Sequence, residues 1–236
     1  MIRSEAIMGR FFDLDSPFMR ILNRVADLMI LNFLMIICCI PIITVGASVT
    51  AMHYVLLKMI RGEDGYLIRG FFKSFRENFK QATLIWFLML VVIAVYIGDA
   101  VIFSFSGIVF PKPLVIAVVA VGVVIFLIAM YVFPLLARFD NSIRNTIKNA
   151  ALIAIGNLPK TILMAVLYVL PLVICYLSTY AMLFVFLFGI SAPAFGAAWL
   201  YSNIFKKFEP EVEMVSDMDF TVDMGEKSEE INGESE

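Results

Sequence analysis

Residues 161–205 read TILMAVLYVLPLVICYLSTYAMLFVFLFGISAPAFGAAWLYSNIF and contain no Asp, Glu, Lys or Arg. A helix needs about 20 apolar residues to cross the roughly 30 Å hydrocarbon core of a bilayer, so this stretch is long enough for two crossings. We expect it to turn near Leu177, Ser178 and Thr179, with helices near 161–177 and 181–203. The stretch therefore predicts an all-α protein that spans a membrane.

Three further stretches lack charged side chains, namely residues 28–57, 81–98 and 113–137. The whole chain is 61% hydrophobic and 16% charged, against roughly 45–50% and 25% for soluble domains. Lipid must cover this excess of apolar surface. The four stretches together predict a polytopic helical bundle with five to six membrane segments.

The stretch 28–57 has two interpretations, because it is too long for one level crossing and too short for two complete ones. Pro41 lies in its middle and disfavours an unbroken helix. A single crossing would leave 13 Lys and Arg residues in the cytoplasm and 5 outside, whereas a hairpin would leave 17 inside and 1, Lys112, outside. Cytoplasmic loops collect Lys and Arg, so we favour three hairpins with both termini cytoplasmic in a multi-pass cell-membrane protein.

A weak internal repeat points to the same three hairpins, since Asn23, Asn78 and Asn157 each stand where a polar segment gives way to an apolar one. The second arm of each expected hairpin carries a proline and ends at a basic residue: Pro41 and Lys58, Pro134 and Arg138, Pro193 and Lys206.

The segment 65–81 predicts an amphipathic helix at the cytoplasmic surface. Phenylalanines recur on one helical face and basic residues on another. Near an anionic leaflet each basic residue contributes on the order of 1 kcal/mol, so one interpretation is a helix lying among anionic lipid headgroups. The other is a docking helix for a partner protein. The candidate interface or docking residues are Arg69, Phe72, Lys73, Phe75, Arg76, Phe79 and Lys80. Similar cytoplasmic helices are expected after Asp140 and after Asp15.

Charge divides the chain into three parts. Residues 1–24 form an N-terminal cytoplasmic or interfacial segment, residues 25–208 form the helical transmembrane domain, and residues 209–236 form an acidic tail. The tail holds 11 acidic residues and one lysine. It has too few large apolar residues to offset the entropy cost of ordering, so we expect it to be disordered.

No catalytic constellation is recognisable. The chain has one histidine and no zinc-protease, serine-hydrolase, nucleotide-binding or dinucleotide-binding motif. Its three cysteines lack metal-ligand spacing. We therefore expect no enzyme activity, no cofactor, no metal site and no nucleic-acid partner.

Polar residues at membrane depth are the remaining candidates for function. Asn32, Thr44, Ser48, Thr50 and His53 cluster in the first stretch, and Thr44, Ser48 and His53 are candidates for contact with a solute. A structural interpretation is also open, because small and hydroxyl-bearing residues let membrane helices approach one another and form hydrogen bonds.

Three motifs occur in order: PIITVGA at 41–47, RGED at 61–64 and FKSFRENFKQA at 72–82. With them the chain resembles the YesL-like family of bacterial membrane proteins over residues 10 to about 205. The family has no established catalytic or binding residues to transfer. Its members are often encoded beside sugar-uptake and polysaccharide-degrading genes of Gram-positive bacteria. The resemblance thus implies an accessory role in carbohydrate uptake or utilisation, with an ABC transporter permease or its regulator as partner. A small secondary transporter or channel is the alternative.

Overall fold

The computed structural model describes residues 17–63, 65–105 and 111–208. The chain divides into two units, Met1–Asn203 and Ile204–Glu236. The described part of the second unit is short and comprises the end of the last helix and a turn. The expected acidic tail and the first 16 residues lie outside the described residues. Every regular element within the described ranges is a helix, which confirms the all-α prediction.

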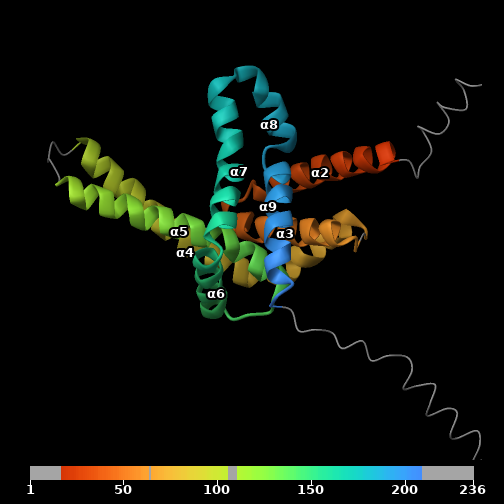
Figure 1. Ribbon diagram of the computed structural model, residues 1–236, viewed down its shortest axis with the longest axis horizontal. Helices are drawn as coiled ribbons and strands as arrows, with labels where there is room; N and C mark the ends of the chain where they lie inside the picture. Colours follow the sequence, from red (N-terminus) through yellow and green to blue (C-terminus); the bar gives the residue numbers. More distant parts are fainter. Residues whose placement is uncertain (1–16, 64, 106–110, 209–236) are drawn as a thin grey trace, which may run out of the picture. The chain divides into compact units, whose positions relative to one another are not determined.

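Most of the described chain is helical (Figure 1). The elements are α2 (Pro17–Cys39), η1 (Ile42–Thr44), α3 (Val45–Arg61), α4 (Leu67–Phe105), α5 (Lys112–Arg138), α6 (Ile143–Gly156), α7 (Leu158–Leu177), η2 (Thr179–Ala181), α8 (Met182–Phe188) and α9 (Ser191–Phe205). Five spans are long and apolar enough to cross a membrane, and the bent pair α8 and α9 supplies a sixth. The predicted five to six membrane segments are therefore confirmed for the described residues. They pair along the chain as α2 with α3, α4 with α5, and α7 with α8 and α9.

The stretch 28–57 forms two helices with a break at Ile40 and Pro41, so it is not one continuous crossing. Thr44 holds the turn closed, because its hydroxyl lies 2.5 Å from the carbonyl oxygen of Cys38 and 2.7 Å from that of Pro41. Pro41 lies in the turn and not inside the second arm, which corrects its expected place. Its missing N–H costs the structure nothing there, since no helical hydrogen bond is interrupted.

Helix α3 is the most buried of the candidate spans and packs against α2, α4 and α5. Gly46 allows the close approach of α4. A Cβ atom added at Gly46 would lie 2.7 Å from Cβ of Trp86 and closer still to the carbonyl oxygen of Ala82. The indole N–H of Trp86 donates a 2.8 Å hydrogen bond to the carbonyl of Ile42. The PIITVGA motif is thus a turn followed by a tight helix contact.

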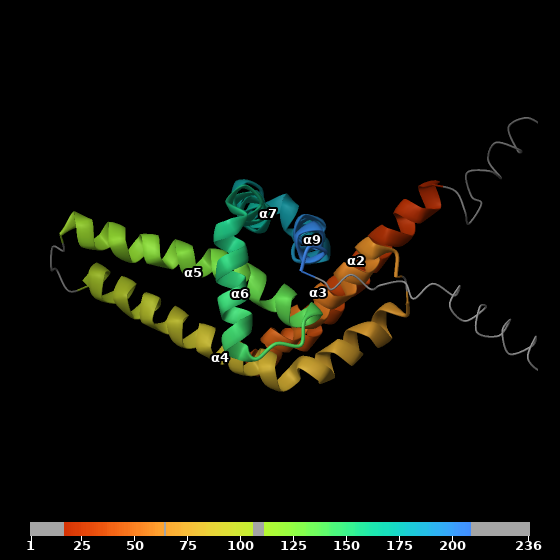
Figure 2. The ribbon, with the colours of Figure 1, turned by 60° about the horizontal axis from the view of Figure 1, so that its bottom comes forward.

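Helix α4 unites the expected amphipathic helix and the membrane helix that follows it in one element, Leu67–Phe105. The expected boundary between the two near Gln81 is therefore absent, because no helix-breaking residue separates the two parts. Figure 2 shows that α4 bends part-way along its length. Phe71 is fully buried, so its ring is part of the protein core and is not inserted into lipid.

The outer parts of α4 and α5 run side by side away from the rest of unit 1 (Figures 1 and 2). The hydroxyl of Tyr96 donates to the carbonyl of Val118 at 3.2 Å, and its ring packs where Gly122 has no side chain. Large apolar side chains are exposed along both helices. Contiguous apolar surface on this scale requires lipid. The exposed residues include Val91, Ile93, Val95, Ile97, Ile116, Val119 and Val121.

The third hairpin turns where the sequence predicts, since α7 ends at Leu177 and Ser178 follows as its C-cap. Its second arm, expected as one helix over 181–203, is instead broken between α8 and α9, which meet at an angle of 51°. Pro193 lies in the first turn of α9, where a missing N–H is tolerated. Of the three prolines expected within second arms, Pro134 is the one that lies inside a helix beyond its first turn.

Candidate functional site

Thr44 and Ser48, two of the candidates for solute contact, bond to the backbone of their own segment. The Ser48 hydroxyl donates to the carbonyl of Thr44 at 2.9 Å, and the Thr44 hydroxyl is engaged with the turn described above. Thr50 bonds in the same way to the carbonyl of Gly46 at 2.9 Å. These three hydroxyls therefore serve the turn and the helix that follows it.

His53, the third candidate, is buried in the bundle. Its Nδ1 lies 2.9 Å from the hydroxyl of Tyr201 on α9, and both side chains are at most 3% exposed. The two rings meet edge to face, with centroids 5.8 Å apart. The pair joins the first hairpin to the third, and His53 does not line the basic pocket described below.

Asn32 forms hydrogen bonds with backbone groups on both sides of the break between α8 and α9 in the third hairpin. Its amide nitrogen donates to the carbonyl of Phe186 at the end of α8 (2.7 Å). Its amide oxygen accepts from the backbone N–H groups of Ile190 (3.3 Å) and Ser191 (3.1 Å). One fully buried side chain on α2 thereby satisfies groups at both ends of a discontinuous helix, where the bilayer offers no water to do so.

A second buried polar pair lies between α5 and α7. The hydroxyls of Tyr131 and Thr161 are 3.0 Å apart, and that of Thr161 also lies 3.0 Å from the carbonyl oxygens of Ala154 and Asn157. The break between α6 and α7 thus receives a side-chain hydrogen bond, as does the break between α8 and α9.

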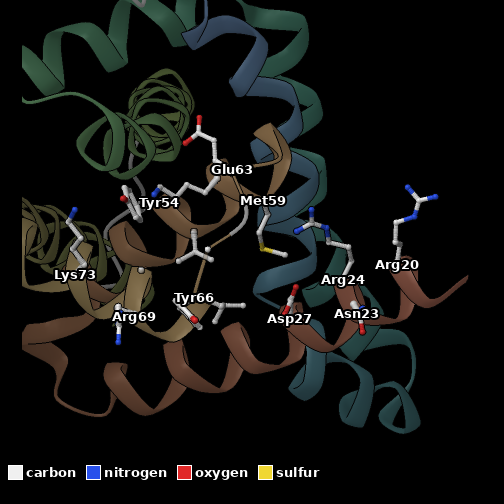
Figure 3. A pocket seen from close by; sticks show the side chains of 15 residues that line it. Arg20, Asn23, Arg24, Asp27, Tyr54, Met59, Glu63, Tyr66, Arg69 and Lys73 are labelled. Carbon is white, nitrogen blue, oxygen red and sulfur yellow. The ribbon is translucent and has the colours of Figure 1, made fainter. Parts of the chain in front are cut away.

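The strongest candidate for a binding site is a pocket at the open end of the first hairpin, opposite its turn. The pocket has a volume of about 620 Å³ and opens between the N-terminal part of α2, the C-terminal part of α3 and the start of α4 (Figure 3). We name it the basic pocket. Its polar lining residues are Arg20, Asn23, Arg24, Asp27, Tyr54, Lys58, Glu63, Tyr66, Arg69 and Lys73.

Each wall of the basic pocket is one face of a helix. Residues 20, 23, 24 and 27 follow the i, i+3, i+4, i+7 spacing on α2, and residues 66, 69, 70 and 73 repeat that spacing at the start of α4. Tyr54 and Lys58 stand four apart on α3. Gly62 ends α3 in the left-handed conformation with φ of 71°, which turns the chain from α3 toward α4.

Two cations of the pocket lie over aromatic rings. Lys58 Nζ is 5.1 Å from the ring centroid of Tyr54, and the guanidinium carbon of Arg69 is 5.2 Å from that of Tyr66. Such contacts orient a cation without neutralising its charge. Five cations and two carboxylates line the pocket in all, so its field is positive.

The basic residues among the predicted interface and docking residues fall into two groups, and the phenylalanines differ in exposure. Arg69 and Lys73 line the basic pocket, while Arg76 and Lys80 are exposed further along α4. Phe72 is 38% exposed. Phe75 and Phe79 are half-buried and their rings lie 5.6 Å apart.

The described residues hold no group of three His, Cys, Asp or Glu side chains that could bind a metal ion. Cys38, Cys39 and Cys175 are half-buried free thiols. Because five cations line the basic pocket, the chemistry that it can perform is the recognition of an anion through cationic and hydrogen-bonding side chains.

A family model described as "Protein of unknown function, DUF624" matches residues 28–100. Over these residues the chain is similar to the DUF624 family. YesL-like proteins carry this domain family, which confirms the resemblance over the matched residues. No curated protein and no solved structure matches the chain. The DUF624 match runs from within α2 through α3 and most of α4. It therefore includes the lining residues of the basic pocket that come from α3 and the start of α4, and none of those on α2.

The sequence reasoning missed the basic pocket, although a signal for it was present. Arg20, Arg24 and Asp27 follow the i, i+4, i+7 spacing that places them on one face of α2, while apolar residues occupy its other faces. Only the packing of α2 against α3 brings that face opposite Lys58 and Arg69.

Proposed function

We propose that this protein is a non-enzymatic accessory component of carbohydrate uptake or utilisation in a bacterial cell membrane, where it associates with an ABC transporter or its regulator. The carbohydrate context rests on the YesL-like resemblance. The molecular part of the proposal rests on the start of α4, a basic helix that is fixed to the bundle on one side and exposed on the other.

The geometry of α4 favours docking over simple anchoring in lipid. Phe71 is fully buried, and a Cβ atom added at Gly70 would lie 3.9 Å from the side chain of Val55 and 4.0 Å from that of Tyr54 on α3. Arg76 and Lys80 are exposed. A rigid helix that presents cations can fit an acidic groove of a partner subunit with little loss of conformational entropy.

The orientation follows from the positive-inside rule. The open ends of the three hairpins carry 17 of the 18 Lys and Arg residues, and Lys112 is the exception. We therefore place these ends, both termini and the exposed start of α4 in the cytoplasm, where a nucleotide-binding subunit or a regulator would be accessible.

Affinity purification of the tagged full chain in a mild detergent tests this proposal. We expect permease, nucleotide-binding or sensor subunits to be recovered with the wild type and at least several-fold less with Arg76→Gln/Lys80→Gln. The matched control is Arg144→Gln/Lys148→Gln, which removes two exposed cations from α6. Repeated recovery of the wild-type chain alone would count against an accessory role.

A small transporter or channel is the second candidate, and the break between α8 and α9 is the observation that favours it. Discontinuous helices often form substrate and ion sites in transporters. Here Asn32 already bonds both ends of the break, which favours a structural role. Flux of a sugar or ion into liposomes that contain the purified chain, altered by Thr44→Ala or Ser48→Ala, would support transport.

A further inference from the structure

We propose that the basic pocket binds the phosphate group of an anionic ligand and that an acidic phospholipid headgroup is the ligand it fits best. This site goes beyond the proposed accessory function, because it needs no partner protein. Its volume of about 620 Å³ lies within the roughly 300–1,000 Å³ that is typical of small-ligand sites.

The charges of the pocket match a phosphate. Arginine offers a planar set of N–H donors that fits phosphate oxygens, and lysine adds a compact positive charge. Arg20, Lys58 and Arg69 come from three different helices, so positive charge is present on all three walls of the pocket. Basic pockets between membrane helices on the cytoplasmic side are a known way of holding lipid headgroups.

Lys58 and Arg69 are the two cations of the pocket on which the proposal depends. Lys58 and Arg69 each contact a tyrosine ring, and within the described residues neither makes an ion pair. Lys73 lies 4.0 Å from Glu77, and both side chains are more than half exposed, so water screens that pair.

The rest of the pocket's lining is apolar and favours a lipid over a soluble phosphate. Val55 and Met59 are 5% and 8% exposed, and Leu67 and Gly70 also line the pocket. Beyond Asp27, α2 has no charged residue. The pocket therefore lies where the charged ends of the helices meet their apolar spans, the level at which a lipid joins its phosphate to its acyl chains.

Two carboxylates also line the pocket and narrow the choice of headgroup. Asp27 and Glu63 would repel a second negative charge but can accept hydrogen bonds from hydroxyl groups. A glycerol headgroup supplies one phosphate charge and two hydroxyls. Phosphatidylglycerol is therefore the probe of choice, with zwitterionic phosphatidylcholine as its comparison.

The experiment measures lipid binding to the purified full chain in detergent by native mass spectrometry. Phosphatidylglycerol and phosphatidylcholine are titrated separately, and inorganic phosphate is titrated by calorimetry as the soluble source of the same group. Lys58→Gln/Arg69→Gln is the pocket variant. Arg144→Gln/Lys148→Gln is the control with the same change in net charge, because α6 does not line the pocket.

We expect phosphatidylglycerol to bind the wild type at least about tenfold more tightly than phosphatidylcholine, and the pocket variant to lose most of that preference. The control should retain it. If inorganic phosphate instead shows the pocket-dependent binding and the lipid does not, the same site serves a soluble phosphate ligand and the preference for lipid is wrong.

Equal affinities for the two lipids together with no pocket-dependent binding of phosphate would overturn the proposal, as would an equal loss in the α6 control. Arg20→Gln/Arg69→Gln replaces two exposed lining residues and gives the same test should Lys58→Gln impair folding. Partner recovery through Arg76 and Lys80 is measured separately, so either proposal can fail while the other stands.

Discussion

The side-chain oxygen of Asn32 accepts a 3.1 Å hydrogen bond from the backbone N–H of Ser191, which lies 159 positions later in the chain. Together with the bond from Asn32 to the carbonyl of Phe186, this contact closes the break between α8 and α9 and ties the first hairpin to the third. A helix broken within a membrane exposes polar backbone groups that lipid cannot satisfy, so Asn32 makes the discontinuity tolerable.

Replacing Asn32 should therefore destabilise the bundle. We expect Asn32→Ala to lower the free energy of unfolding by about 1–3 kcal/mol, because backbone groups at the break lose their partner. Thermal unfolding in detergent, followed by circular dichroism, measures the change. Asn145→Ala, at an exposed position on α6, should change stability by less than about 0.5 kcal/mol. Equal stability of the two variants would show that the break needs no bond from α2.

The pair formed by His53 and Tyr201 should behave as a coupled unit. Tyr201→Phe leaves Nδ1 of a buried histidine without this partner, and we expect a loss of about 1–3 kcal/mol in the free energy of unfolding. His53→Leu/Tyr201→Phe should cost less than the sum of the single variants. Tyr180→Phe at a position 95% exposed is the control. Strict additivity in the double-mutant cycle would mean that the 2.9 Å contact contributes nothing.

Gly46 should tolerate no side chain. A Cβ atom there would lie 2.7 Å from Cβ of Trp86 and would also clash with the backbone of Ala82, so the helices must separate. We expect Gly46→Ala to cost about 1–3 kcal/mol of unfolding free energy. Gly98→Ala, where nothing lies within 4 Å of the added atom, should be neutral or stabilising by up to about 1 kcal/mol. The account of the α3–α4 contact fails if both substitutions have the same effect.

The contact between the outer parts of α4 and α5 offers a further test of packing. A Cβ at Gly122 would lie 3.0 Å from the ring of Tyr96. Gly122→Leu should push the two helices apart and break the bond from Tyr96 to Val118. We expect faster proteolysis of the loop between the two helices, while Val119→Leu on an exposed face should leave the rate unchanged. Unchanged proteolysis of both variants would contradict the described contact.

Much of the fold could be predicted because lipid imposes long uncharged helices. The stretches that cross, the turn after Leu177 and the break near Pro41 all follow from local sequence. The bend between α8 and α9 does not, since Gly189 and Ile190 alone do not forbid a helix and the stabilising bond comes from Asn32. The continuity of α4 does not follow from the pattern either, because the change from polar to apolar residues at Gln81 suggests a boundary, although no residue there ends a helix.

The candidate site was predicted only in part for a similar reason. Arg69 and Lys73 were recognised from the pattern of α4 alone, and the structure places both at the basic pocket. Their companions on α2 and α3 become neighbours only through the hairpin. Thr44, Ser48 and His53 were singled out as polar residues at membrane depth, and the sequence could not show that hydrogen bonds within the bundle engage all three.

We propose that the chain crosses the membrane as three hairpins with their open ends in the cytoplasm. Topology reporters fused after residues 24, 60, 108, 145 and 236 test this arrangement directly. We expect a cytoplasmic signal at 24, 60, 145 and 236 and an external signal at 108. Reporters at 24 and 60 on opposite sides of the membrane would contradict it, because residues 28–57 would then cross only once.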